Sequence, residues 1–123
     1  MRANLLLVED HDDMRLALRE WLLTTFSPSS LREARSMDEA LTLAGQAKVD
    51  FALINLELPG PNGIEAVREL RKRYGSLAMV LMSVHDSEAL RLAAMDAGAD
   101  AFVSKRELTL ALLPIVHRLM QRN

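Results

Sequence analysis

Short apolar runs alternate with amphipathic stretches along the chain, and the alternation repeats five times. An apolar run of about four to eight residues bounded by turn-forming residues is typical of a buried strand. Several of these runs are apolar on both faces, which indicates parallel strands covered by helices on each side. The strands that this pattern predicts are residues 4–9, 30–34, 50–55, 77–83 and 100–104. Residues 30–34 are the most polar of the five, so we expect them nearer an edge of the sheet.

The stretches between these strands carry the spacing and the end signals of helices. Ser36 and Glu39 have the spacing of a capping box, and residues 62–65 open the following helix. Gly75 and Gly98 stand where two helices are expected to stop. The helix before Gly98 has two candidate caps, Asp86 and Ser87, and the apolar face of the first helix consists of Met14, Leu18, Trp21, Leu22 and Thr25.

The last predicted helix lies within residues 107–121. Pro114 lies inside it and cannot donate a helical hydrogen bond, so we expect the helix either to start late or to bend there. Its apolar residues exceed one narrow stripe, which predicts either a helix buried more fully than average or an exposed apolar surface for a partner. These residues are Leu112, Leu113, Ile115, Val116, Leu119 and Met120.

The order of these elements is five consecutive strand–helix units. This order predicts an α/β fold, a doubly wound five-stranded parallel sheet with helices on both faces. The 123 residues suffice for one domain with a sizeable core and are too few for two, so we expect a single domain over residues 1–123.

Composition excludes several classes of function. Fifteen basic against seventeen acidic residues leave a formal charge of −2 without a basic stripe, so we expect this domain not to bind nucleic acid. The absence of cysteine excludes a disulfide framework and a cysteine-ligated zinc site. The first ten residues resemble neither a signal peptide nor a membrane span, and we expect a cytoplasmic location without membrane association. No P-loop motif for nucleotide binding occurs.

Polar residues follow the predicted strands at their carboxyl ends, where ligands bind in such sheets. Glu9 and Asp10 follow the first strand, and Asn55 ends the third. Two carboxylates and an amide carbonyl are suitable ligands for a hard cation such as Mg²⁺. Ser83, at the end of the fourth strand, and Lys105, after the fifth, offer a hydroxyl and a positive charge for phosphate oxygens. The set suits a phosphoryl group held beside a metal ion.

At these residues the sequence resembles the receiver domain of two-component response regulators, over essentially all 123 residues. The segments "LLLVEDH", "LPGPNG", "VLMSVHD" and "AGADAFVSK" match the family's motifs in the right order and spacing. The resemblance implies the flavodoxin-like fold of CheY-like proteins and a role in phosphorelay signal transduction. The "EDH" and "DAGADAFVSK" segments look most like receivers of helix-turn-helix transcription factors.

The resemblance also implies residue roles and partners. Glu9 and Asp10, the Glu57 backbone carbonyl and residue 55 would bind Mg²⁺, and Lys105 would bind a phosphoryl oxygen. Ser83 and Phe102 would form the switch pair. The partners implied are a sensor histidine kinase or phosphotransfer protein, a homodimer through the fourth and fifth helices, and a DNA-binding output domain outside this chain. Arg106 replaces the proline that often follows the lysine, which disfavours a cis peptide bond there.

The sequence departs from the family at Asn55, which stands where the phosphoacceptor aspartate would be. An amide oxygen is neutral and a poor nucleophile, so we expect no phosphorylation at residue 55. Asn55 also removes one of three crowded carboxylates, and we expect weakened Mg²⁺ binding. Asn55→Asp is therefore expected to lower stability slightly without Mg²⁺ and to strengthen Mg²⁺ binding. Asparagine is either an engineered replacement or the natural residue. Without phosphorylation we expect mostly the inactive arrangement, unless a partner supplies the binding energy.

Two other functions fit the residues. One is a phosphorylation-independent interaction or dimerisation domain, in which the last helices carry the function. The other is a Mg²⁺-dependent phosphohydrolase, which also places an aspartate at a strand end. Asn55 removes that nucleophile, and Glu57 stands where such enzymes usually have an aspartate. We therefore expect a signalling module and not an enzyme.

Overall fold

Five parallel strands form one sheet in a computed structural model of the chain, which describes residues 2–121. The strand order is β2-β1-β3-β4-β5, so β2 is an edge strand, as its polar sequence predicted. All five residues of β3 are buried. The strands are β1 (Asn4–Val8), β2 (Ser30–Ala34), β3 (Phe51–Asn55), β4 (Ala78–Ser83) and β5 (Ala101–Ser104), each within one residue of its predicted bounds.

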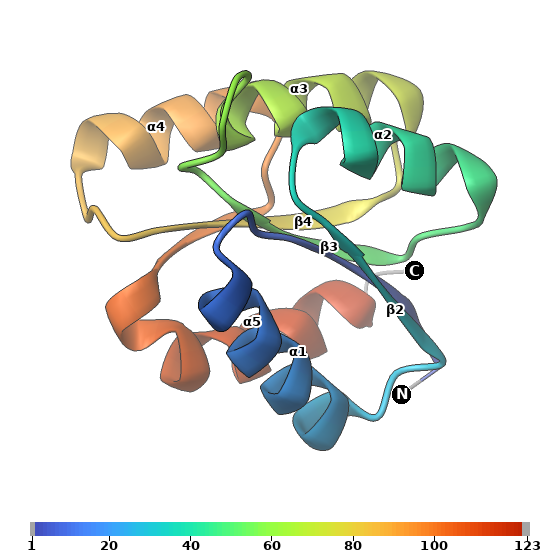
Figure 1. Cartoon of the computed structure of the whole chain (residues 1–123). Helices are drawn as coiled ribbons and strands as arrows, with labels where there is room; N and C mark the ends of the chain where they lie inside the picture. The colour runs from blue at the N-terminus through green and yellow to red at the C-terminus, as the bar shows by residue number, and fades with distance from the viewer. Residues whose placement is uncertain (1, 122–123) are drawn as a thin grey trace.

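Helices cover both faces of the sheet, which confirms the doubly wound α/β prediction (Figure 1). Neighbouring residues of β1 point to opposite faces: Leu6 and Val8 pack in the core under α2, α3 and α4, whereas Leu5 and Leu7 pack against α1 and α5. The helices are α1 (Asp12–Phe26), α2 (Met37–Gln46), α3 (Gly63–Arg73), α4 (Glu88–Ala97) and α5 (Leu108–Met120). Within residues 2–121, none of these helices has the length and apolar character needed to cross a bilayer.

The predicted helix caps are present. The side chains of Ser36, Asn62 and Ser87 each accept a hydrogen bond from the backbone N–H three residues further along, at the starts of α2, α3 and α4. Ser87 is therefore the cap of α4, and Asp86 is not. Gly98 ends α4 in the left-handed conformation, with φ of 117°. Residues with a Cβ atom rarely adopt this conformation, so glycine is favoured at this position. These signals are local, which is why the sequence reveals them.

One detail of the helices differs from the prediction. Thr25 is exposed, because Phe26 takes the core-facing position one turn after Leu22 and packs edge-on against Trp21, with ring centroids 5.7 Å apart. The aromatic ring buries more apolar surface than the threonine side chain could. The end of α3 agrees with the prediction, because the helix ends at Arg73 with Tyr74 as its cap, directly before Gly75.

The last helix does not start late. A single 3₁₀ turn (Lys105–Glu107) leads directly into α5, which continues through Pro114. Pro114 is exposed, so water can reach the backbone carbonyl that its missing N–H leaves without a helical partner. Leu112, Val116 and Leu119 are buried, whereas Leu113 is 50% exposed, so the helix presents apolar surface on two sides.

The loop after β3 passes unusually close to the strand at Gly63, the first residue of α3. A Cβ atom at this position would lie 2.3 Å from the backbone oxygen of Asn55 and 2.8 Å from the Leu56 Cα. Both neighbours are backbone atoms, which cannot move aside without shifting the strand end. Glycine at residue 63 therefore allows α3 to begin directly against the end of β3.

We expect Gly63→Ala to lower the free energy of unfolding by about 2–3 kcal/mol, because it forces backbone apart in a packed region. Gly75→Ala is the matched control, since nothing lies within 4 Å of a Cβ there, and it should change stability by about 0.5 kcal/mol or less. Urea denaturation of both variants measures the difference. Equal stability of the two variants would show that the loop does not depend on this close approach.

Candidate functional site

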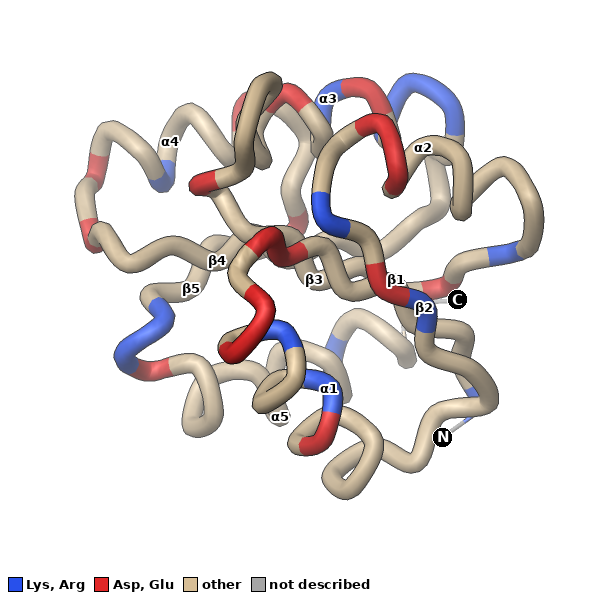
Figure 2. Tube along the Cα trace, viewed as in Figure 1, with Lys and Arg blue, Asp and Glu red and all other residues tan. Residues whose placement is uncertain are grey.

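The carboxyl ends of the parallel strands bring the predicted site residues to one edge of the sheet. Asn55 is the last residue of β3 and pairs in register with Met82 on β4, one residue before Ser83. Glu9 follows β1, and Lys105 follows β5. Figure 2 shows acidic positions gathered where β1 passes into α1 and basic positions directly after β5. Their assigned roles in binding remain predictions.

The Asn55 side chain lies at the centre of this group and is 2% exposed as a residue. Its Nδ2 donates hydrogen bonds to Glu9 Oε2 at 3.1 Å, Asp10 Oδ1 at 3.5 Å and the Glu57 backbone oxygen at 2.7 Å. Three acceptors around one atom determine the orientation of the amide, because the opposite orientation would turn an oxygen toward three oxygens. The Asn55 NH₂ group thus lies among the oxygen atoms that would surround a cation.

The other end of the same amide has no partner. Asn55 Oδ1 is the one buried side-chain nitrogen or oxygen without a hydrogen bond within residues 2–121. A buried, unpaired acceptor of this kind has a cost of about 1–3 kcal/mol. The hydrogen bonds at Nδ2 offset that cost, so the amide is held by its nitrogen and not by its oxygen.

Glu9 is fully buried, and its charge is balanced by Lys105. Lys105 Nζ donates to Glu9 Oε1 at 2.8 Å, and the backbone N–H of His11 donates to Glu9 Oε2 at 3.1 Å. With the Asn55 amide, both carboxylate oxygens have partners. A buried carboxylate needs such pairing to offset its desolvation. Lys105 therefore pairs with an acid of the site in this arrangement.

Ser83 is also fully buried, and its hydroxyl is engaged. It donates to Glu57 Oε2 at 2.6 Å and accepts from the His85 backbone N–H at 3.0 Å. The second oxygen of the same carboxylate, Oε1, accepts from the Val84 backbone N–H at 3.3 Å. The sequence indicated only the Glu57 backbone carbonyl as a ligand. Nothing in the spacing showed that its side chain would reach β4.

Phe102 packs in the core on the α4 side of the sheet and is 4% exposed. Arg91 of α4 covers the ring, with its guanidinium carbon 5.2 Å from the ring centroid, and its Nη1 donates to the Phe102 backbone oxygen at 3.0 Å. This cation–π contact holds the ring in place. The role of Phe102 as a switch stays a prediction, and sequence reasoning did not identify Arg91.

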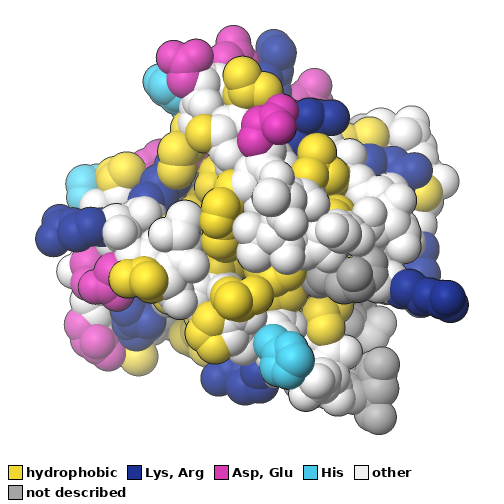
Figure 3. Space-filling view, turned by 90° about the horizontal axis from the view of Figure 1, so that it is seen from below, with side chains coloured by type: hydrophobic (Ala, Val, Ile, Leu, Met, Phe, Trp, Pro, Cys, Tyr) yellow, Lys and Arg dark blue, Asp and Glu magenta, His cyan; other side chains and the backbone are white. Residues whose placement is uncertain are grey.

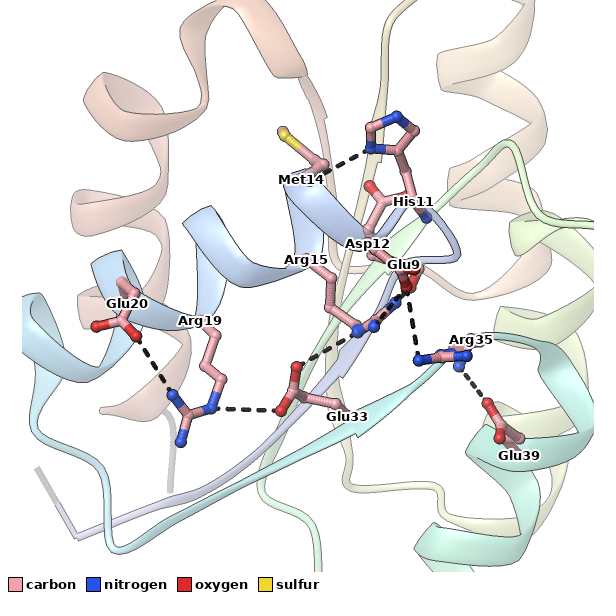
Figure 4. Close-up of polar contacts among 10 residues, drawn as sticks. All are labelled: Glu9, His11, Asp12, Met14, Arg15, Arg19, Glu20, Glu33, Arg35 and Glu39. Atoms are coloured by element: carbon pink, nitrogen blue, oxygen red, sulfur yellow. Dashed lines mark hydrogen bonds and ion pairs between the residues drawn. The ribbon is translucent and has the colours of Figure 1, made fainter.

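A network of arginines borders the site on the α1 side (Figure 4). Arg15 donates to the Glu9 backbone oxygen at 3.1 Å and to Asp12 at 2.8 Å, and it forms an ion pair with Glu33 of β2 at 3.3 Å. Its hydrogen bond, together with the charge of Arg35, holds the pKa of the Asp12 carboxyl below its usual value. These contacts fix the turn that carries Glu9 between β1 and α1.

The oxygen atoms at this edge of the sheet are of the type that magnesium ions prefer as ligands. The two carboxylates of Glu9 and Asp10 and the Glu57 carbonyl are hard oxygen ligands, and all three approach the Asn55 Nδ2. A group of three or more acidic, histidine or cysteine side chains able to hold a metal ion is not found within residues 2–121. The Asn55 amide nitrogen lies within 3.5 Å of all three of these oxygen atoms.

The fold and the acidic strand ends define a receiver-type α/β domain, and the comparisons with known proteins agree. The family model of the response regulator receiver domain matches residues 5–116, and the chain therefore belongs to that family. A crystal structure of a two-component response regulator of the LuxR family from Aurantimonas sp. SI85-9A1 superposes with a TM-score of 0.90. The two sequences are 31% identical, and the superposition covers 100% of this chain and 89% of the Aurantimonas chain.

Curated relatives include regulators of transcription. Transcriptional activator protein ExaE of Pseudomonas putida is 34% identical over 94% of this chain and 54% of its own length. The KDP operon transcriptional regulatory protein KdpE of Escherichia coli is 35% identical over 84% of this chain and 44% of its own length. The chain thus spans about half the length of these relatives. Receiver domains of this family are signalling modules of two-component systems and are generally not enzymes.

Proposed function

We propose that the chain is a receiver module whose phosphoacceptor position is held by Asn55, so that the module takes up no phosphoryl group at this site. The observation that supports this most is the position of the Asn55 Nδ2, within 3.5 Å of Glu9, Asp10 and the Glu57 carbonyl. The amide offers no anionic oxygen for attack on phosphorus. It also places a hydrogen-bond donor where a cation would be needed.

The remaining residues are suited to a phosphoryl site. Glu9, Asp10 and the Glu57 carbonyl would hold Mg²⁺, which, when bound, neutralises charge on a phosphoryl oxygen. Lys105 would leave Glu9 and give its positive charge to a second oxygen, and Ser83 would donate its hydroxyl to a third. An aspartate at residue 55 would complete the set. Weakened Mg²⁺ binding and absent phosphorylation are therefore parts of one proposal.

The partners of the whole regulator follow from the family. A sensor histidine kinase or a phosphotransfer protein is the proposed donor partner of a receiver that has the aspartate. Because the named relatives are transcriptional regulators about twice as long as this chain, a DNA-binding output domain is the proposed downstream partner. In this chain the kinase input does not reach residue 55, and protein contacts would have to supply the signal.

Intact-protein mass spectrometry after incubation with Mg²⁺ and acetyl phosphate tests this function. We expect Asn55→Asp to gain one phosphoryl group and the unsubstituted chain to gain none. Asn62→Asp is the matched control, because it makes the same chemical change at a helix cap where aspartate is equally suitable. It should gain none.

Two outcomes would contradict the proposal. If the unsubstituted chain gains a phosphoryl group that tryptic mapping places at residue 55, the amide does not silence the site. If Asn55→Asp stays unmodified while folded, the site is not suited to phosphoryl transfer, and a role without phosphorylation is favoured.

The second candidate function is a phosphorylation-independent dimerisation domain, and exposed apolar side chains on α4 and α5 favour it. Leu92 and Met95 of α4 are 60% and 45% exposed, and Leu110 and Leu113 of α5 are 83% and 50% exposed. Figure 3 shows apolar side chains at the surface of the face that α1 and α5 cover. Large apolar side chains left exposed on neighbouring elements often mark an interface, and both helices contact the edge strand β5.

Light scattering at increasing protein concentration tests the dimer. We expect the unsubstituted chain to dimerise and Leu110→Glu to remain a monomer, because the charge would be buried in the interface. Leu16→Glu on α1, a residue 56% exposed, is the control and should still dimerise. A monomer at all concentrations, or a dimer that Leu110→Glu does not weaken, would exclude this surface.

A further inference from the structure

The Glu57 carboxylate bridges the end of β3 and the end of β4. Its two oxygens accept the Ser83 hydroxyl at 2.6 Å and the Val84 backbone N–H at 3.3 Å. The Ser83 oxygen in turn accepts the His85 N–H at 3.0 Å. An acid of the β3–α3 loop thus contacts Ser83 at the end of β4 and Val84 directly after it through charge-assisted bonds, which are stronger than neutral ones, and Ser83 in turn holds His85.

The donors that Glu57 occupies are suited to an anion. A hydroxyl and a backbone N–H that approach one carboxylate from the end of a strand form a small anion-binding site. Ser83 is fully buried, so an empty site would leave its hydroxyl without water to replace the lost partner. The chain fills this site with a side chain of its own.

The Glu57 carboxylate faces β4 and not the cation position. Only its backbone oxygen lies beside the Asn55 Nδ2, at 2.7 Å, while both carboxylate oxygens are engaged by Ser83 and Val84. The main chain of Glu57 and its side chain therefore serve two neighbouring places: one suited to a cation and the other to an anion.

We propose that the Glu57 carboxylate acts as an internal anion that positions Ser83 in place of a phosphoryl group. The inference rests on the proposed function, because it takes Ser83 as the residue that would otherwise contact phosphate. Glu57 is a positioning residue, since it acts through the orientation of the Ser83 hydroxyl and of the β4–α4 loop.

With both positions filled from within the chain, a different resting state is expected. The Asn55 amide occupies the cation position, and Glu57 occupies the anion position, so the pocket needs neither Mg²⁺ nor phosphate to be satisfied. Ser83 is already directed into the pocket, and Phe102 is already buried beneath Arg91. The chain therefore holds one arrangement of its switch residues constitutively, where the sequence alone led us to expect the inactive arrangement.

Scalar couplings between the Ser83 Hα, Hβ and ¹⁵N nuclei test the inference, because they report the χ1 rotamer populations in solution. The measurement uses the full chain without Mg²⁺ and without a phosphate donor. Hydrogen bonds to a charged acceptor favour one rotamer by about tenfold or more, so a single Ser83 rotamer is expected. Glu57→Ala should average the rotamers and shift the Val84 and His85 amide signals.

Glu57→Gln keeps the length of the side chain and one acceptor oxygen but removes the charge, so it should retain the preference in part. Glu65→Gln, at an exposed position of α3, is the control and should leave the couplings unchanged. If Ser83 keeps a single rotamer with unchanged Val84 and His85 signals in both Glu57 variants, the inference is wrong. Since no phosphorylation is involved, this failure differs from a failure of Asn55→Asp to accept a phosphoryl group.

Discussion

We expect Lys105→Met to lower the free energy of unfolding by about 3–5 kcal/mol, the largest loss among the substitutions considered. Lys105 Nζ lies 2.8 Å from Glu9 Oε1, and the Glu9 side chain is 1% exposed. Removal of the ammonium leaves a buried carboxylate with hydrogen bonds but no opposite charge. Methionine keeps most of the aliphatic length, so the loss reports the charge and not the packing.

Lys48→Met is the control for this effect. Lys48 also pairs with an acid, Asp50 at 3.6 Å, but the Lys48 side chain is 81% exposed. Exposed pairs contribute about 0–1 kcal/mol, so this variant should be close to the unsubstituted chain. Urea denaturation at neutral pH and without Mg²⁺ compares the two. If Lys105→Met and Lys48→Met unfold at the same urea concentration, Lys105 does not balance the Glu9 charge in solution.

The second large effect is expected for Asn55→Asp in the absence of Mg²⁺, a loss of about 2–4 kcal/mol. The substitution replaces a donor by an acceptor beside Glu9, Asp10 and the Glu57 carbonyl, so three hydrogen bonds become repulsive contacts. The sequence predicted only a slight loss, because it showed the extra charge but not the hydrogen bonds. Thermal unfolding in the presence of a chelator measures this change.

Asn62→Asp serves again as the control and should keep the stability of the unsubstituted chain, because aspartate caps a helix as well as asparagine does. Added Mg²⁺ should restore most of the stability of Asn55→Asp by binding only the folded state. An Asn55→Asp variant as stable as Asn62→Asp with the chelator present would mean that the amide nitrogen does not make these contacts.

The fold followed from the sequence because its signals are repeated and local. The buried strand 51–55, the polar edge strand 30–34 and the serine cap at residue 36 each depend on a few neighbouring side chains. The sequence predicted Thr25 on the apolar face of α1, where the structure has Phe26. Adjacent side chains point in directions only about 100° apart around a helix, and packing decides which of the two faces the core.

The sequence also predicted which residues lie together at the candidate site, since parallel strands place their carboxyl ends at one edge of the sheet. The pairing within the site did not. Residue types alone do not determine that Lys105 pairs with Glu9, that Glu57 reaches Ser83, or which end of the Asn55 amide points to the acids. These choices depend on side-chain rotamers and on the balance of charges between strands far apart in sequence.

We propose above all that the Asn55 amide nitrogen occupies the cation position of a receiver site. A Mg²⁺ titration by calorimetry, with the unsubstituted chain and Asn55→Asp under identical conditions, tests it most directly. We expect Asn55→Asp to bind Mg²⁺ at least about tenfold more tightly, because it adds a carboxylate ligand and removes a competing donor. Equal affinity of the two proteins for Mg²⁺ would contradict the claim.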